Sequence, residues 1–352
     1  MPSRRSDTFA ALIIAALTAA PVAARGAEPL TLKFGFPSPA DSYINTEGIT
    51  PWIDAVESAA GGAIKIELFA GATLGTFGNI YERTLDNVAQ ISFGAFGTIV
   101  GPFPRTQVSN LPFLSDNTEQ SSVALWRLYA EGLLDPEYGK VKVLGLFTFP
   151  GLEMNTNKPI QAIGDVQGLR LAVPSRTVGD IAVKLGAAPV FLTPSDFYLS
   201  LKRGLADGVV VGWPAIQTFK LAEVTKYHLA LPLGEAPSFI FMNKDAFAAL
   251  PAAAQAAIDK FSGEAFSRRM GAVNETAAEG AAKHVAAAPG QSVTALSAEQ
   301  TRLWQARVQP ITDAWAAQTP DGAKVLAAYQ AALATIRGAD EAGAARGVAP
   351  TR

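Results

Sequence analysis

The chain has 352 residues, of which 49% are hydrophobic and 17% are charged, and its formal net charge is -2. This length is sufficient for two domains of ordinary size, and the near-neutral charge balance argues against a surface for nucleic acid or anionic lipid. The chain contains no cysteine, which excludes disulfides and thiolate chemistry.

The N-terminal segment, residues 1–24, has the features of a secretory signal peptide. Two arginines precede an apolar run over residues 9–20, and the small residues of "VAA" form a cleavage site. We predict cleavage after Ala24, with Ala27 as the alternative. A membrane anchor is the competing interpretation, but the run is short and Pro21 interrupts it. The mature protein is therefore expected to be exported, by either the Sec or the twin-arginine route.

Downstream of this segment, apolar runs typical of strands alternate with segments of helical pattern. The runs predict strands at 30–36, 63–69, 89–96, 140–149, 168–174 and 207–213. Val209, Val210 and Val211 in succession are typical of a strand that is buried on both faces. The alternation predicts an α/β fold with largely parallel sheets.

The sequence changes character after residue 244, where it becomes rich in alanine and helical in pattern, with Gly263 as a possible break. Further helices are predicted near 297–337. Residues 338–352 are rich in small residues, so we predict a loose C-terminal tail.

Signatures of catalysis are absent from the sequence. His228 and His284 are the only histidines and lie far apart, and there is no HExxH, GxSxG or Walker motif. Glu82 and Asp86 have helical spacing, which is typical of a solvated helix face. We therefore expect no enzyme, no metal and no cofactor.

The sequence shows clearer features of a binding site than of a catalytic site. In parallel α/β sheets a ligand binds beyond the carboxyl ends of the strands. Candidate binding residues at such ends are Ser38, Tyr43, Phe93, Phe96, Phe149 and Trp213. Aromatic rings among glycines favour a concave site for a small molecule. A core position is favoured for any single phenylalanine, whereas Gly212 and Pro214 end the strand beside Trp213 and favour its place in the site.

Several segments, taken in their order and spacing, resemble the substrate-binding proteins of TRAP transporters, the DctP-like family. The segments are "GGAIKIELFAGATLG", "LPFL", "TNKPI", "GLRLAVP", "GAAPVFLTPSDFYLSLKRGLADG" and "MNKDAFAALPAAAQAAI". The resemblance covers about residues 30–335. It implies a periplasmic receptor that captures a small organic solute, mostly a carboxylate in this family, and delivers it to the membrane permease subunits without itself inserting stably in the membrane.

The resemblance also implies a two-lobed architecture in which crossing strands and a long helix join the lobes. The first lobe is expected to contain 25–149 and about 238–280, and the second 150–237 and about 281–337. Solute binding is expected to close the lobes about 149–151 and 237–239, which adds Phe239 to the candidate binding residues.

The chain departs from the family pattern at the positions where family members bind the carboxylate of their solute. Ala172 stands at the position of the usual clamping arginine, Glu153 at that of a second arginine, and Trp213 at that of an asparagine. Arg176 follows the end of its strand and is predicted to replace the clamp. The alternative role for Arg176 is a salt bridge to Asp180.

Arg170 lies near the start of the same strand, so it is expected to be remote from the crevice, with its guanidinium in solvent.

The charge of the solute depends on two of these side chains. An organic acid is favoured, because the family mostly binds carboxylates and because the guanidinium of Arg176, if it lines the cleft, binds a carboxylate in bidentate fashion. An unpaired Glu153 would favour an amine or a zwitterion, and a Glu153–Arg176 pair would leave a site for an uncharged solute. An exported enzyme or a ligand-sensing receptor that feeds a signalling partner is the competing function.

Overall fold

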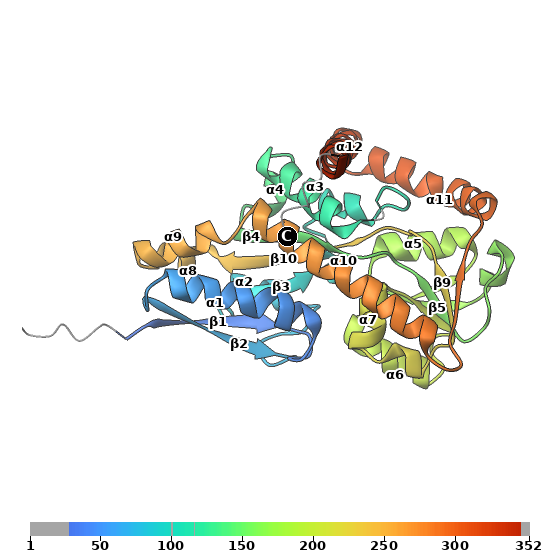
Figure 1. Cartoon of the computed structure of the whole chain (residues 1–352), viewed down its shortest axis with the longest axis horizontal. Helices are drawn as coiled ribbons and strands as arrows, with labels where there is room; N and C mark the ends of the chain where they lie inside the picture. The colour runs from blue at the N-terminus through green and yellow to red at the C-terminus, as the bar shows by residue number, and fades with distance from the viewer. Residues whose placement is uncertain (1–27, 100, 116, 346–352) are drawn as a thin grey trace, which may run out of the picture.

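Two β-sheets, each flanked by helices, form the centres of two lobes (Figure 1). The structure is a computed structural model that describes residues 28–99, 101–115 and 117–345. The predicted signal peptide therefore lies outside the described residues. Within the described ranges, no helix is long and apolar enough to cross a membrane.

The first sheet has five strands in the order β2-β1-β3-β10-β4. Their bounds are β1 Leu30–Phe36, β2 Ile64–Ala70, β3 Ile91–Ala95, β4 Val141–Phe149 and β10 Ala236–Asn243. β1 is parallel to β2 and β3, whereas β10 is antiparallel to β3 and β4. The sheet is mixed rather than wholly parallel because β10 arrives from the other lobe and inserts between two strands of the first.

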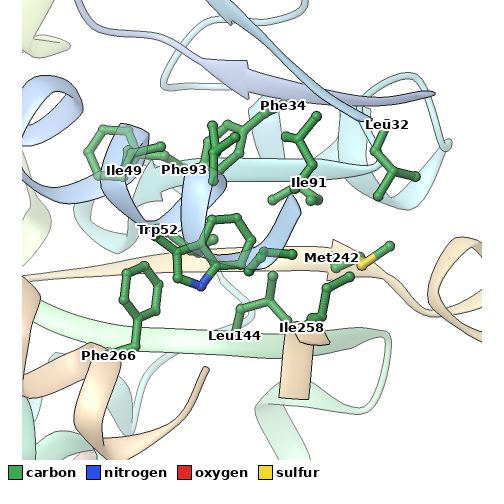
Figure 2. Close-up of a cluster of buried hydrophobic side chains, with 14 of the residues drawn as sticks. Leu32, Phe34, Ile49, Trp52, Ile91, Phe93, Leu144, Met242, Ile258 and Phe266 are labelled. Atoms are coloured by element: carbon green, nitrogen blue, oxygen red, sulfur yellow. The ribbon is translucent and has the colours of Figure 1, made fainter. Parts of the chain in front are cut away.

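Apolar side chains from this sheet and its helices form the core shown in Figure 2. The helices of this lobe include α1 Thr50–Ala59, α2 Ile80–Leu85, α3 Thr118–Ala130, α4 Asp135–Tyr138, α8 Lys244–Ala248 and α9 Ala252–Lys260. The Trp52 ring stacks on Phe266 with centroids 5.4 Å apart, and its indole N–H donates to the carbonyl of Phe261 at 2.9 Å. Phe93 belongs to this core and lies at its edge nearest the other lobe.

The second sheet has six strands in the order β11-β9-β5-β8-β6-β7. Their bounds are β5 Met154–Thr156, β6 Arg170–Val173, β7 Ala188–Phe191, β8 Gly208–Val210, β9 Tyr227–Ala230 and β11 Ser292–Ala295. β8 is buried along its whole length, as the valine run predicts. Helices α5 Arg176–Leu185, α6 Phe197–Lys202, α7 Trp213–Thr218 and α11 Ala298–Gln318 complete this lobe.

Two crossing segments and one long helix connect the lobes. Residues 150–153 lead from β4 to β5, and residues 231–235 lead from β9 to β10. Helix α10, Glu264–Ala287, runs across both lobes (Figure 1). Phe266 near its start packs in the first core, and Val285 near its end packs in the second lobe. The long inter-lobe helix that the family resemblance implies is therefore present, and it starts directly after Gly263.

The C-terminal helix α12, Gly322–Ala345, packs on the first lobe beside α3 (Figure 1). Val325, Tyr329, Leu333 and Ile336 enter the core around α3. The sequence analysis placed residues up to 337 in the second lobe and a loose tail from 338. The structure instead places α12 on the first lobe and continues the helix to Ala345, because this apolar stripe at intervals of three or four residues has a partner in α3.

Candidate functional site

A cavity of about 90 Å³ lies between the two lobes. The first lobe contributes Ser38, Tyr43, Phe77, Phe93, Gly97, Thr98, Asn110 and Phe149 to its lining. The second lobe and the crossing segments contribute Pro150, Leu152, Pro174, Ser175, Val211, Gly212, Pro214 and Ala215. The cavity thus lies beyond the carboxyl ends of β1, β3, β6 and β8, where open α/β sheets bind ligands.

The lobes touch each other at one side of this cavity. A Cβ atom added to Gly97 of the first lobe would lie 2.8 Å from Ser175 Cβ and 3.2 Å from the Pro174 carbonyl oxygen of the second. Asn110 Nδ2 also donates to Ser175 Oγ across the same gap at 3.3 Å. These contacts show that the two lobes are closed over the cavity.

Aromatic rings make up much of the wall on the side of the first lobe. The rings of Phe93 and Phe149 are 6.1 Å apart at an interplanar angle of 66°. Tyr43 is fixed by its hydroxyl, which donates to Asn274 Oδ1 of α10 at 2.8 Å. Burial, with a contribution from the charge of Glu47, raises the pKa of Tyr43 well above its ordinary value, so the phenol stays neutral. The wall offers ring surfaces to a solute.

The polar end of the cavity consists of Asn110 and Ser175. Asn110 ends the helical turn Thr106–Asn110, and Ser175 is the N-cap of α5, where its Oγ accepts from the Val178 N–H at 3.3 Å. The Asn110 side chain is 1% exposed, and its Oδ1 has no hydrogen-bond partner among the described residues. An unsatisfied buried acceptor of this kind is costly.

No arginine, lysine or histidine lines the cavity in the part of the chain that the structure describes. Two carboxyl groups are instead buried behind its wall, one in each crossing segment: Glu153 and Glu235. Glu153 Oε2 has no partner among the described residues, and burial raises the pKa of Glu153 well above its ordinary value although the Trp213 backbone N–H opposes the shift.

Glu235 is held by hydroxyl groups of the first lobe. Its Oε2 accepts from Ser121 Oγ and, at 2.9 Å, from Thr148 Oγ1. Burial raises the pKa of Glu235 to about 7, and these hydroxyl donors only partly oppose the shift. The crossing segments therefore carry carboxyl groups that tend to keep their protons.

Four of the residues named from the sequence line the cavity: Ser38, Tyr43, Phe93 and Phe149. Phe96 and Phe239 do not, because they face the opposite side of the first sheet. Their rings are 4.9 Å apart and both are fully buried in the core around α3. Since neighbouring side chains on a strand alternate between faces, Ile240 rather than Phe239 points toward the core that holds Phe93.

Trp213 is likewise absent from the cavity lining, although its neighbours Gly212 and Pro214 belong to it. Trp213 is 7% exposed and packs in the core of the second lobe, with its ring 5.7 Å from that of His228. Glu153 also lies behind the lining rather than in it.

Arg176 points away from the cavity into solvent. Its side chain is 90% exposed, and Nε lies 3.7 Å from Asp180 Oδ2, the contact that the sequence analysis gave as its alternative. Because Ser175 caps α5, Arg176 is the first residue of the helix and lies on its outer face. A Glu153–Arg176 pair is not formed. Arg170 pairs with Asp207 at 2.9 Å, remote from the cavity.

Asn110, Ser175 and Gly97 are among the lining residues that the sequence analysis did not identify. Asn110 directly precedes the "LPFL" segment and Ser175 directly follows "GLRLAVP", so family segments marked both neighbourhoods. No local pattern relates the three, because their contacts form only where the two lobes meet.

Comparison with known proteins agrees with this arrangement. The sequence model of the family described as bacterial extracellular solute-binding protein, family 7 (DctP) matches residues 38–319. The outer membrane transporter protein TsaT of Comamonas testosteroni is 26% identical over 303 residues, which cover 82% of this chain and 87% of that protein.

Two solved structures are similar throughout the fold. A TRAP solute-binding protein of Rhodoferax ferrireducens with copurified benzoate has 27% identity and a TM-score of 0.83, covering 87% of this chain and 98% of that chain. A marine metagenome TRAP solute-binding protein specific for aromatic acid ligands, in complex with 3-hydroxybenzoate, has 26% identity, the same TM-score and the same coverage.

Proposed function

Since this chain belongs to family 7 of the bacterial extracellular solute-binding proteins, the TRAP solute-binding family, we propose that it clamps a small ring-bearing solute in the cavity between its lobes and delivers it to a TRAP-type membrane permease. The observation that carries the proposal is the closed cavity with aromatic walls. The aromatic ligands of the two similar structures support a solute of this kind. Export to the periplasm through the N-terminal signal peptide and a role without catalysis belong to the same proposal.

A thermal-shift screen of the purified mature protein against a library of organic solutes tests this function. Ligands that bind only the folded state raise its apparent stability by mass action, by about 2.7 kcal/mol at 100 times Kd. We expect ring-bearing solutes to give the largest shifts and to be recovered unchanged. A library without any stabilising solute, or turnover of a hit, would contradict the proposal.

Replacing Gly97 with valine should prevent full closure and weaken solute binding about 30-fold. The three nearest atoms to an added Cβ belong to Pro174 and Ser175, so the added group collides first with the other lobe. Overpacking of a tight contact costs about 1 to 3 kcal/mol, and 30-fold corresponds to about 2 kcal/mol. Calorimetry with the strongest hit of the screen measures the loss.

Gly78→Val is the matched control, because an added Cβ there has no neighbour closer than Thr76 Oγ1 at 3.8 Å. Solution scattering adds a second readout: bound solute should make the wild type and Gly78→Val more compact, and Gly97→Val less so. Equal affinities and equal compaction in the three proteins would rule out closure at this contact.

A further inference from the structure

We propose that the N-terminus of helix α5 binds the carboxylate of a ring-bearing acid, in place of the arginine that the family resemblance implies at Ala172. The donors are the hydroxyl of Ser175 and the backbone N–H groups of Arg176 and Thr177, together with the hydroxyl of Ser38 from the first lobe. This inference rests on the proposed function and names the groups that recognise its solute.

A carboxylate in this cavity has no arginine or lysine to bind it within the part of the chain that the structure describes. Ala172 is fully buried, and the side chain of Arg176 is 90% exposed on the outer face of α5. Burying an anion without a partner is costly, so other donors must replace the missing cation. Hydroxyl and backbone N–H groups are such donors, and a carboxylate accepts from both.

The first turn of α5 has N–H groups to offer at the edge of the cavity. The helix has ten residues, and its N-cap Ser175 lines the cavity. The Gly179 N–H donates to the Ser175 carbonyl at 3.0 Å, and the Val178 N–H donates to Ser175 Oγ at 3.3 Å. The N–H groups of Arg176 and Thr177 have no acceptor among the described residues. Free N–H groups at a helix N-terminus, together with the helix dipole, attract an anion.

The Ser175 hydroxyl is arranged as a donor. Its Oγ accepts from the Val178 N–H and from Asn110 Nδ2, each at 3.3 Å, so both lone pairs are in use. Its proton has no acceptor in the described part of the chain. Asn110 belongs to the first lobe, so closure of the lobes orients this hydroxyl. Asn110 acts through Ser175, because its own Oδ1 is enclosed.

Ser38 is a second, independent donor on the wall of the cavity. Its side chain lines the cavity and is only 4% exposed, yet its hydroxyl has no hydrogen-bond partner among the described residues. Unlike Asn110 Oδ1, this hydroxyl oxygen is not fully enclosed. Ser38 follows β1, the strand beside β3, and Gly97 after β3 touches Ser175. A carboxylate has two oxygens, so it can accept from donors of both lobes and hold them together.

The carboxyl groups behind the wall do not oppose an anion at mildly acidic pH. Burial raises the pKa of Glu153 well above its ordinary value and that of Glu235 to about 7. Both therefore keep their protons at pH 6, whereas a solute carboxylate with an ordinary pKa of about 4 is ionised there. The solute then carries the negative charge that the N-terminus of α5 attracts.

The dimensions and walls of the cavity define the rest of the acid. An engineered apolar cavity of about 150 Å³ holds benzene, so a cavity of about 90 Å³ limits the solute to about one ring. The rings of Phe93, Phe149 and Tyr43 provide flat apolar surfaces for it.

Titration calorimetry at pH 6 with benzoate and benzamide tests the inference, because the two share size and shape and only benzoate is charged. We expect benzoate to bind tenfold or more tightly, a difference of about 1.4 kcal/mol. Benzamide binding as tightly as benzoate, or no binding of benzoate, would overturn the inference. In either case a solute of another class found in the library would leave the proposed function intact, whereas an empty library would remove that function.

Two substitutions of Arg176 separate its backbone N–H from its side chain. Arg176→Ala and Arg176→Pro both lose the guanidinium, but only proline also loses the N–H. Proline is well tolerated at the first position of a helix, and Ser175 before it has the extended conformation that a following proline requires, with φ -147° and ψ 162°. Benzoate should bind Arg176→Pro about tenfold more weakly than Arg176→Ala. Equal affinities of the two variants would contradict binding by this N–H, and a loss that is already complete in Arg176→Ala would assign the carboxylate to the guanidinium.

Ser175→Ala removes the hydroxyl donor and should weaken benzoate binding about tenfold. Ser297→Ala is the matched control, because Ser297 caps α11 in the same way, accepting from the Gln300 N–H at 3.2 Å, and does not line the cavity. Both variants lose an N-cap, so both should lose stability, but Ser297→Ala should change affinity less than threefold. Circular dichroism shows whether each variant is folded.

Ser38→Ala gives a measure that does not depend on the folding of α5, and it should weaken benzoate binding threefold or more. Equal affinities of folded Ser175→Ala and Ser297→Ala would overturn the role of Ser175, and wild-type affinity in Ser38→Ala would overturn that of Ser38.

Discussion

Replacing Trp213 with alanine should lower the free energy of unfolding by about 3 to 5 kcal/mol, the usual cost of removing a buried tryptophan. The side chain is 7% exposed and packs with Val211, Ile216 and other apolar residues of the second lobe. This loss is a large part of the roughly 5 to 15 kcal/mol that stabilises an ordinary protein. Urea unfolding at neutral pH measures it directly.

Phe149→Ala is the comparison for Trp213→Ala, because Phe149 lines the cavity and is only partly buried. It should lose more affinity for the solute and less stability than Trp213→Ala. The sequence analysis placed Trp213 in the binding site. An unchanged free energy of unfolding in Trp213→Ala, together with a loss of affinity of about 30-fold, would return it there.

Stability should fall by about 3 kcal/mol between pH 4.5 and pH 7 through Glu235 alone. Its carboxyl has a pKa of about 7 when folded, against 4.5 as the ordinary value. The folded protein therefore retains a proton that the unfolded chain has lost, and stability decreases as pH rises from 4.5 to 7 and then levels off. One pKa unit corresponds to about 1.36 kcal/mol, which gives the magnitude.

Several charged or titratable groups act on Glu235 or respond to it. Burial is the largest cause of the raised pKa of Glu235, Glu153 and Tyr329 of α12. The charge of Glu275 of α10 raises the pKa of Glu235 further, and the charge of Glu235 adds to the shifts of Glu153 and Tyr329. Arg337 opposes the shift at Tyr329. Glu153 contributes with the same sign as Glu235, because burial raises its pKa as well.

Glu235→Gln is the variant that isolates this contribution, because glutamine resembles the protonated acid. It should be more stable than wild type at pH 8 and nearly equal to it at pH 4.5. Glu279→Gln, at a side chain that is 65% exposed on α10, is the control and should follow wild type throughout. Urea midpoints across this pH range give the comparison. Parallel pH profiles for wild type and Glu235→Gln would show that Glu235 keeps an ordinary pKa.

The parts of the fold that the sequence predicts are those with continuous apolar runs. β1 coincides with the predicted 30–36, and β2, β3 and β4 start and end within two residues of the expected positions. β11 was not predicted because all four of its residues are exposed, so it has no burial pattern. The last part of α12 was expected to be loose because its composition is rich in small residues, whereas its place beside α3 depends on residues distant in the sequence.

The candidate site was only partly predictable for a related reason. The aromatic residues after β1, β3 and β4 were identified because the carboxyl ends of strands converge at the cavity. Asn110 and Ser175 come from a helical turn and a helix cap in different lobes, so their contact exists only in three dimensions. Arg176 was expected in the crevice because it follows the strand end. Ser175 instead caps α5, so Arg176 is the first residue of the helix and lies on its outer face.

A crystal structure of the protein with the strongest hit of the solute screen tests the central claim most directly. We expect the solute inside the cavity, between Phe93, Phe149 and Tyr43 of the first lobe and Pro214 of the second. A solute bound outside the inter-lobe cavity would contradict the claim.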